Sequence, residues 1–264
     1  MTRIICIANQ KGGVGKTTTA VNLSAALAVF EKRTLLVDCD PQANATSGVG
    51  IEKSEIEQNL YHGMLGRARA ENLIVDSEIE TLKVIPADTE LIGFEIEMME
   101  SADREVRLKR LIAELKDSFD YIILDCPPSM SLLTVNALTA ADSLLIPLQC
   151  EFYALEGLGQ LLNTVNRVQQ SLNPDLVIAG ILLTMFDRRT NLSYQVAEEA
   201  ENYFENLVFK TTVPRNIRLS EAPSFGKPIL LYDATSTGAQ SYFDLAREIL
   251  QNNNNKVNHA ERNC

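Results

Sequence analysis

The chain has 264 residues and a formal net charge of −11, and 45% of its residues are hydrophobic whereas 22% are charged. This composition is typical of a globular protein and excludes a disordered or fibrous chain. The length suits one large α/β domain or two small ones. The acidic balance argues against a protein whose whole surface coats nucleic acid or anionic lipid, although it leaves room for a local basic patch.

The sequence contains no run of about 18 apolar residues, the length that a membrane span requires. Its start lacks the charged region, long apolar stretch and cleavage site of a signal peptide. Five cysteines, an odd number without any Cys-x-x-Cys pair, favour reduced thiols over a disulfide framework or a zinc site. We therefore expect a cytoplasmic protein without stable membrane association.

Short β-branched runs alternate with stretches of helical spacing along the chain. Most of the runs lack polar alternation, which is typical of strands buried on both faces of a parallel sheet. Alternating strands and helices predict an α/β fold with a doubly wound, mostly parallel sheet flanked by helices. The predicted strands are residues 3–8, 34–38, 82–86, 121–125, 143–148, 177–184 and 207–211.

No strong domain boundary interrupts these patterns, so we predict a single domain over residues 1–250. Residues 52–80 are more polar and have weak periodicity, which favours a surface excursion. Residues 251–264 form a polar tail that includes four consecutive asparagines. Because such a composition buries little apolar area, we expect the tail to be disordered.

The most informative segment is residues 9–18, which read Asn-Gln-Lys-Gly-Gly-Val-Gly-Lys-Thr-Thr. It follows a predicted strand and opens a predicted helix, which is the context of a loop that binds phosphate groups. The glycines allow successive N–H groups to turn inward, and the positive end of the helix favours an anion. Lys16 can reach the β- and γ-phosphates of ATP, and the Thr17 hydroxyl can bind Mg²⁺. The predicted nucleotide-binding residues are Lys11, Gly12, Gly13, Val14, Gly15, Lys16, Thr17 and Thr18.

Two acidic segments end predicted strands, namely Asp-Cys-Asp-Pro-Gln at residues 38–42 and Tyr-Ile-Ile-Leu-Asp-Cys-Pro-Pro at residues 121–128. Ligands of open α/β sheets lie at the carboxyl ends of the strands, so these carboxylates should face the phosphates. Asp40 is the candidate for positioning the attacking water, with a metal contact as a further role. Asp125 is predicted to hold a Mg²⁺-bound water, and Asp38 to support the metal site indirectly or act structurally.

The loop departs from the usual Gly-x-x-x-x-Gly-Lys-Ser/Thr pattern, because Gln10 stands where the first glycine would be. In this it resembles the deviant Walker A loop of the ParA/MinD ATPases, whose additional signature lysine corresponds to Lys11. Five further blocks are similar to the chromosomal ParA/Soj partition ATPases, a family of P-loop NTPases. These blocks are residues 38–48, 104–110, 149–158, 184–192 and 213–228.

The resemblance implies an ATP-dependent homodimer in which Lys11 reaches the phosphates held by the partner subunit. Gly12 would lie where the two loops nearly meet, so that a side chain there blocks the closed dimer. Lys11, Lys16 and Asp40 are then the catalytic residues of a slow ATPase that converts ATP and water to ADP and phosphate. A ParB-type centromere-binding protein is the implied partner that stimulates it.

The same resemblance implies contacts to the adenine and to DNA. Pro214 and Asn216 would contact the base, because an amide can read the adenine edge and a proline ring can pack on its face. Arg189 and Arg218, with Arg188 as a further candidate, would bind double-stranded DNA without sequence preference and keep the protein on the nucleoid. Few phosphate contacts per subunit mean weak binding by one copy and useful avidity in a dimer, which reconciles DNA binding with the acidic charge.

Two other members of this superfamily are alternatives. A MinD-like membrane-associated positioning ATPase would require an amphipathic C-terminal helix, and residues 251–264 lack an apolar face. A reductase like the nitrogenase iron protein would require four thiolates around a cluster, and Cys126 has no second cysteine in a suitable context. The sequence therefore favours a DNA-segregation ATPase.

Overall fold

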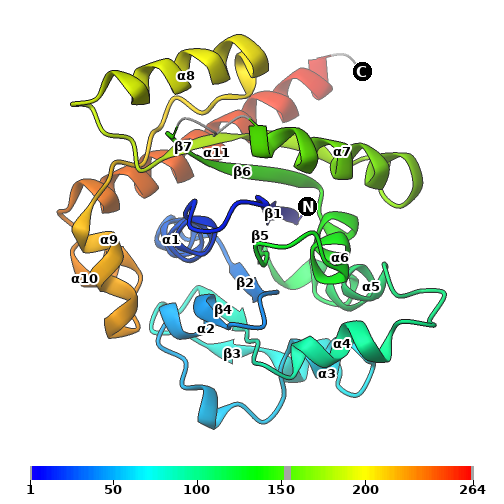
Figure 1. Ribbon diagram of the computed structural model, residues 1–264. Helices are drawn as coiled ribbons and strands as arrows, with labels where there is room; N and C mark the ends of the chain where they lie inside the picture. The colour runs from blue at the N-terminus through cyan, green and yellow to red at the C-terminus, as the bar shows by residue number, and fades with distance from the viewer. Residues whose placement is uncertain (1, 152–155, 263–264) are drawn as a thin grey trace.

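The computed structural model describes residues 2–151 and 156–262, which form a seven-stranded sheet with helices on both faces (Figure 1). The strand order is β3-β4-β2-β5-β1-β6-β7, and all neighbours are parallel except β3 and β4. The strands are β1 Arg3–Ile7, β2 Thr34–Asp38, β3 Val75–Asp76, β4 Leu82–Ile85, β5 Tyr121–Asp125, β6 Ser143–Gln149 and β7 Val177–Thr184. The helices are α1 Lys16–Val29, α2 Asn44–Gly48, α3 Leu60–Met64, α4 Leu91–Glu97, α5 Arg107–Ala113, α6 Leu132–Ala140, α7 Glu156–Ser171, α8 Asn191–Phe204, α9 Ile217–Glu221, α10 Ile229–Tyr232 and α11 Thr237–Arg262. The predicted α/β fold is confirmed.

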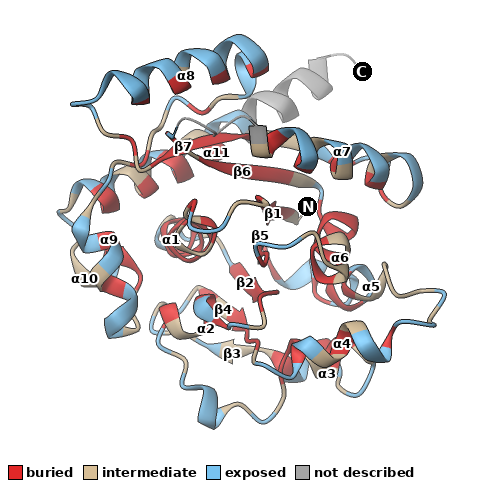
Figure 2. Ribbon diagram, viewed as in Figure 1, coloured by how far each residue is buried: buried red, intermediate tan, exposed pale blue. Residues whose placement is uncertain are grey.

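The sheet separates two layers of hydrophobic core. Successive side chains of a strand point to opposite faces, so Ile4 and Cys6 of β1 enter one layer whereas Ile5 and Ile7 enter the other. Helices α3 to α8 contribute to the first layer, and α1, α2, α9, α10 and α11 contribute to the second. The central strands and α1 are buried, whereas α8 is exposed on its outer side (Figure 2). Burial on both faces explains why these strand sequences are apolar without alternation.

The parallel register brings chemically important positions to one edge of the sheet. Ile7 of β1 pairs with Asp125 of β5, and Asp38 of β2 pairs with the same aspartate from the other side. All three strands therefore end beside one another. The loop that follows β1 begins at this common edge, and Asp38 and Asp125 lie at it, which is where open α/β sheets bind ligands.

The predicted strand at residues 207–211 is wrong, because this segment makes just one isolated bridge to β7. The carboxylate of Glu248 accepts hydrogen bonds from the N–H groups of Lys210 and Thr211, at 2.9 and 3.0 Å. Since a side chain takes these donors, a strand ladder does not form there. The strand that the sequence did not reveal is β3, an antiparallel edge strand of two residues.

The segment 52–80 is more than a surface excursion. Leu60, Met64 and Leu73 are fully buried members of the first core layer. These side chains are spaced irregularly along one short helix and one 3₁₀ turn, so they produce no extended periodicity in the sequence.

Helix α11 ends at Arg262 and thus runs through most of the segment for which we expected a disordered tail. A helix satisfies most of its own backbone hydrogen bonds, so a polar sequence can continue a helix that begins in the core. Residues 263–264 lie outside the described part of the chain. Within that described part, no helix is both long and apolar enough to span a membrane.

Gly180 of β7 packs closely against the segment that follows α8, and this contact can be tested by a substitution. A Cβ at Gly180 of β7 would lie 2.6 Å from Cε2 of Phe209 and 2.8 Å from the carbonyl oxygen of Leu207. Gly180→Ala should therefore lower the free energy of unfolding by about 1–3 kcal/mol, measured by urea denaturation. The matched control is Gly159→Ala in α7, where a Cβ meets no described atom within 4 Å and the helix should gain up to about 1 kcal/mol. Equal urea midpoints for the parent and Gly180→Ala would contradict the close approach.

Candidate nucleotide-binding site

The loop between β1 and α1 has the backbone that its glycines predict. Gly13 has a φ of +73° and Gly15, which precedes the first residue of α1, has a φ of +87°. Both values lie in the left-handed region, which glycine adopts without strain. A Cβ at Gly12 would meet no described atom within 4 Å, so this position faces open space in a single copy of the chain.

Two residues that the sequence analysis did not select hold this loop in place. The side chain of Asn9 donates to the carbonyl of Pro147 at 2.7 Å and accepts from the N–H of Lys11 at 3.0 Å. Thr184, at the end of β7, donates its hydroxyl to the carbonyl of Val14 at 2.8 Å. The loop is therefore anchored to β6 and β7. Asn9 lies two residues before Lys11 in the same loop, which is a usable signal, whereas Thr184 is distant in sequence.

Lys16 is buried at the start of α1, with 7% of its surface exposed. Its Nζ donates to the carbonyl oxygen of Lys11 at 2.9 Å, so the ammonium group lies over the loop. Burial lowers the pKa of Lys16, and the nearby Asp125 acts in the opposite direction. The side chain is thus a point charge in a poorly hydrated position, where its attraction for phosphate oxygens is strengthened.

The two aspartates after β2 have different surroundings. Asp38 is fully buried, and its Oδ2 accepts from the N–H and the hydroxyl of Thr46, both at 2.8 Å. Burial raises the pKa of Asp38 to about 6 although these hydrogen bonds act against the rise. Asp40 is 7% exposed, and its Oδ1 accepts from the N–H of Gln42 at 2.9 Å. Asp38 therefore fixes helix α2 to the sheet, and the charge of the buried Asp40 acts on Lys16.

Asp125 has the most unusual environment. Both of its carboxylate oxygens are buried, and neither has a hydrogen-bond partner of normal geometry among the described residues. Burial, followed by the charge of Asp38, raises the pKa of Asp125 well above its usual value, whereas the Thr17 hydroxyl and the Lys16 ammonium lower it. A buried carboxylate without a partner is unfavourable unless a cation or a donor arrives. The Asp125 carboxylate and the Thr17 hydroxyl therefore fit the oxygen ligands that Mg²⁺ prefers.

Lys11 lies at the rim of the loop and is 37% exposed at its side chain. Its Nζ forms an ion pair of 2.8 Å with the carboxylate of Glu151, which follows β6. The side chain of Gln149 also binds this carboxylate. Glu151 belongs to the block 149–158, of which residues 152–155 lie outside the described structure. Lys11 is thus turned toward its own chain, held by a residue that the sequence analysis did not select.

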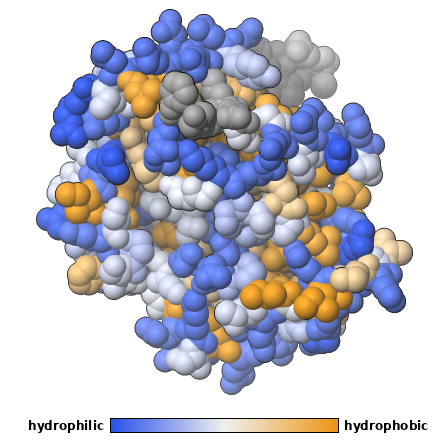
Figure 3. All heavy atoms as spheres, in the orientation of Figure 1, coloured by the Kyte–Doolittle hydropathy of each residue, from blue (hydrophilic) through white to orange (hydrophobic). Residues whose placement is uncertain are grey.

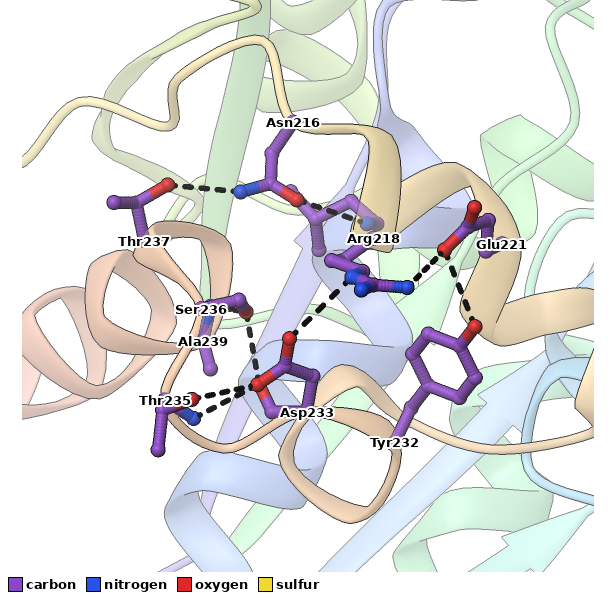
Figure 4. A network of polar contacts seen from close by, with 10 residues as sticks. Asn216, Arg218, Glu221, Tyr232, Asp233, Thr235, Ser236, Thr237 and Ala239 are labelled. Atoms are coloured by element: carbon purple, nitrogen blue, oxygen red, sulfur yellow. Dashed lines mark hydrogen bonds and ion pairs between the residues drawn. The ribbon is translucent and has the colours of Figure 1, made fainter.

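Asn216 acts as a helix cap. Its Oδ1 accepts from the N–H of Leu219 in the first turn of α9 at 3.3 Å, and its Nδ2 donates to the Thr237 hydroxyl at 2.8 Å (Figure 4). An amide has one further N–H and one further lone pair, so a base contact has to use this remaining capacity or replace a bond. Pro214 forms a bridge with Phe186, which brings the segment before α9 next to the end of β7.

Of the three candidate DNA-binding arginines, Arg188 and Arg189 follow Phe186, and Arg218 follows Pro214. All three are exposed, and two of them form ion pairs. Arg189 pairs with Asp187 at 2.8 Å, and Arg218 pairs with Glu221 at 2.9 Å and with Asp233 at 3.5 Å (Figure 4). Ion pairs between exposed side chains contribute little stability and exchange readily. Each arginine is therefore able to exchange its carboxylate partner for another anion.

Known proteins resemble this chain over nearly its full length. A model of the AAA domain family matches residues 2–178. The sporulation initiation inhibitor protein Soj of Bacillus subtilis is 60% identical over 96% of this chain and 100% of its own. The chromosome partitioning protein ParA of Myxococcus xanthus is 57% identical over 94% of this chain and 88% of its own.

Solved structures show the same architecture. A cobyrinic acid a,c-diamide synthase from Mycobacterium smegmatis with bound ADP and magnesium has a TM-score of 0.84 at 37% identity and 95% coverage of both chains. The cell division ATPase MinD of Pyrococcus furiosus has a TM-score of 0.79 at 27% identity, covering 95% of this chain and 99% of its own. Taken with the loop geometry and the buried Asp125, these similarities establish that the chain belongs to the ParA/Soj family of chromosome-partitioning ATPases, which use ATP and Mg²⁺.

Proposed function

We propose that this chromosome-partitioning ATPase binds DNA without sequence preference as an ATP-dependent homodimer, and that a ParB-type partner stimulates its slow hydrolysis and so releases it. The observation that carries the proposal is the contrast between the two lysines of the loop. Lys16 is buried over its own loop, whereas Lys11 is exposed at the rim and paired with Glu151. A rim lysine can reach across to a second copy, and a nucleotide bound by both copies links ATP binding to dimerisation.

The residues of the site divide the work of hydrolysis. The backbone of residues 12–18 and the ammonium of Lys16 bind the phosphates. Thr17 would hold Mg²⁺ directly and Asp125 would hold it through a water, and the ion would neutralise charge on the phosphates. Asp40 would orient the attacking water, which needs positioning more than a strong base. Pro214 and Asn216 would hold the adenine.

Exposed apolar side chains support an association with another protein surface. Ile92, Ile96 and Met99 are 55%, 69% and 65% exposed on α4 and the turn that follows it. Hydrophobic atoms are prominent over this part of the molecule (Figure 3). The Oε1 of Glu95 in the same helix accepts from the N–H of Leu132 at 3.0 Å, which ties α4 to the start of α6, just beyond the loop that follows Asp125. A surface of this kind is suited to a second copy or to the ParB-type partner.

The first prediction concerns Lys11. Lys11→Ala should bind ATP yet fail to dimerise, so DNA retention with ATP should fall to the level measured with ADP or without nucleotide. The measurements are surface retention on non-specific duplex DNA and size-exclusion chromatography with light scattering in the presence of a non-hydrolysable ATP analogue. Lys16→Ala is the control, because it should lose nucleotide binding itself. A parent protein that stays monomeric with the analogue would overturn the proposal.

The second prediction concerns Asp40. Asp40→Ala should lower ATP turnover about 100-fold while leaving ATP affinity nearly unchanged, because the lost interaction acts on the attacking water. The trapped ATP dimer should then remain on DNA longer than the parent. Steady-state phosphate release and DNA dissociation rates test both halves. Turnover equal to that of the parent would show that another group positions the water.

The third prediction concerns the arginines that contact DNA. Arg189→Glu and Arg218→Glu should each weaken DNA retention at least about tenfold and reduce its dependence on salt concentration. ATP-driven dimerisation should stay intact. Arg247→Glu is the matched control, since Arg247 is an exposed arginine of α11 with a similar ion pair to Asp244. Loss of dimerisation together with DNA retention would mean that the two arginines belong to the dimer interface instead.

A further inference from the structure

A cavity of about 340 Å³ lies between the turn after α3 and helix α5. Four arginines line it, with Arg67 and Arg69 on the turn and Arg107 and Arg110 on the helix. Among the described lining residues, Glu114 is the one acidic side chain. None of the lining residues belongs to the phosphate loop, to the loops after β2 and β5, or to the candidate DNA-binding residues.

The carboxylates that pair with these arginines lie outside the lining. Arg67 pairs with Glu97, and Arg69 pairs with Glu71. Arg107 and Arg110 share Asp103, whose pKa is lowered to about 2 by a hydrogen bond from Ser101 and by the two guanidinium groups.

These ion pairs leave the cavity open to an incoming anion. The side chains of Arg67, Arg69 and Arg110 are 51%, 78% and 63% exposed, so their pairs are solvated and exchange readily. A guanidinium group has five N–H donors, and one carboxylate does not use them all.

Arg107 is the most buried of the four, with 27% of its side chain exposed. Its Nε is buried and has no hydrogen-bond acceptor among the described residues. A buried donor without an acceptor is unfavourable in the absence of a ligand. The wall opposite α5 is kept in place by Glu114, whose carboxylate accepts from the N–H of Ala70 at 3.4 Å, so the acidic residue of the lining is itself engaged.

We propose that this cavity is a second anion site, distinct from the nucleotide site, that binds a small molecule carrying two or more phosphate groups. Two N–H groups of one guanidinium group can donate to two oxygens of the same phosphate, whereas the ammonium group of a lysine acts as a point charge. Because two of the arginines line the cavity from the turn and two from the helix, a ligand with several phosphates can contact both sides. The cavity volume lies within the range of about 300–1,000 Å³ that is usual for small-molecule sites. This site goes beyond the proposed DNA-segregation function and does not depend on it.

The test uses inorganic tripolyphosphate as the probe, titrated calorimetrically into the full-length Lys16→Ala chain without Mg²⁺. The Lys16→Ala background removes the phosphate loop as a competing site. We expect one binding site per chain at 150 mM salt. Arg107→Gln with Arg110→Gln in this background should weaken binding at least tenfold. The matched control pair, Arg33→Gln with Arg247→Gln, removes two exposed ion-paired arginines elsewhere and should leave binding unchanged.

An absence of binding would overturn the proposal, and so would an equal effect of the two arginine pairs on binding. If the double variant unfolds at a lower temperature than the control pair, the exposed single variants Arg110→Gln and Arg67→Gln replace it, and each should weaken binding at least threefold. A separate arm measures ATP-dependent DNA retention of the double variant with Lys16 intact. Loss of retention without tripolyphosphate binding would assign the arginines to DNA phosphates and overturn the small-molecule site. If the DNA-segregation proposal is wrong, the parent chain itself will show no ATP-dependent DNA retention, whatever the result of the tripolyphosphate titration.

Discussion

The buried carboxylate of Asp125 is the constraint on which the site depends. It lies at the end of β5 beside Asp38, with no hydrogen-bond partner of normal geometry among the described residues. Burial, followed by the charge of Asp38, raises the pKa of Asp125, and Thr17 and Lys16 act in the opposite direction. A cation at this position would offset the unfavourable burial of the carboxylate, so we expect Mg²⁺ bound with a nucleotide to stabilise this edge of the sheet.

Hydrogen bonds connect the surroundings of the site to neighbouring helices. Asp38 holds α2 through Thr46, and Glu95 of α4 accepts from the N–H of Leu132 at the start of α6. The charged groups farther out are restrained more weakly. Lys11 is paired with Glu151, and Arg218 with Glu221, in exposed ion pairs that exchange at small energetic cost. The buried centre of the site and the exposed ion pairs around it therefore differ in how readily their contacts exchange.

Much of the fold followed from local patterns. Uninterrupted apolar runs such as residues 121–124 identified the central strands, because strands that are buried on both faces rarely show polar alternation. The errors fell where tertiary contacts outweigh local preference. Residues 207–211 have the composition of a strand, yet Glu248 from α11 takes their backbone donors. The core positions in residues 52–80 follow no period that a sequence can display.

By itself, the sequence determined the phosphate loop, its two lysines and the acidic strand ends, since these depend on residue type and spacing within short segments. It also determined the family, through blocks that extend beyond the loop. The tertiary structure alone decided which distant groups meet: Thr184 with the loop, Glu151 with Lys11, Thr237 with Asn216, and four arginines around one cavity. The physical reason is that such contacts join segments separated by many residues, and no local propensity or periodicity records them.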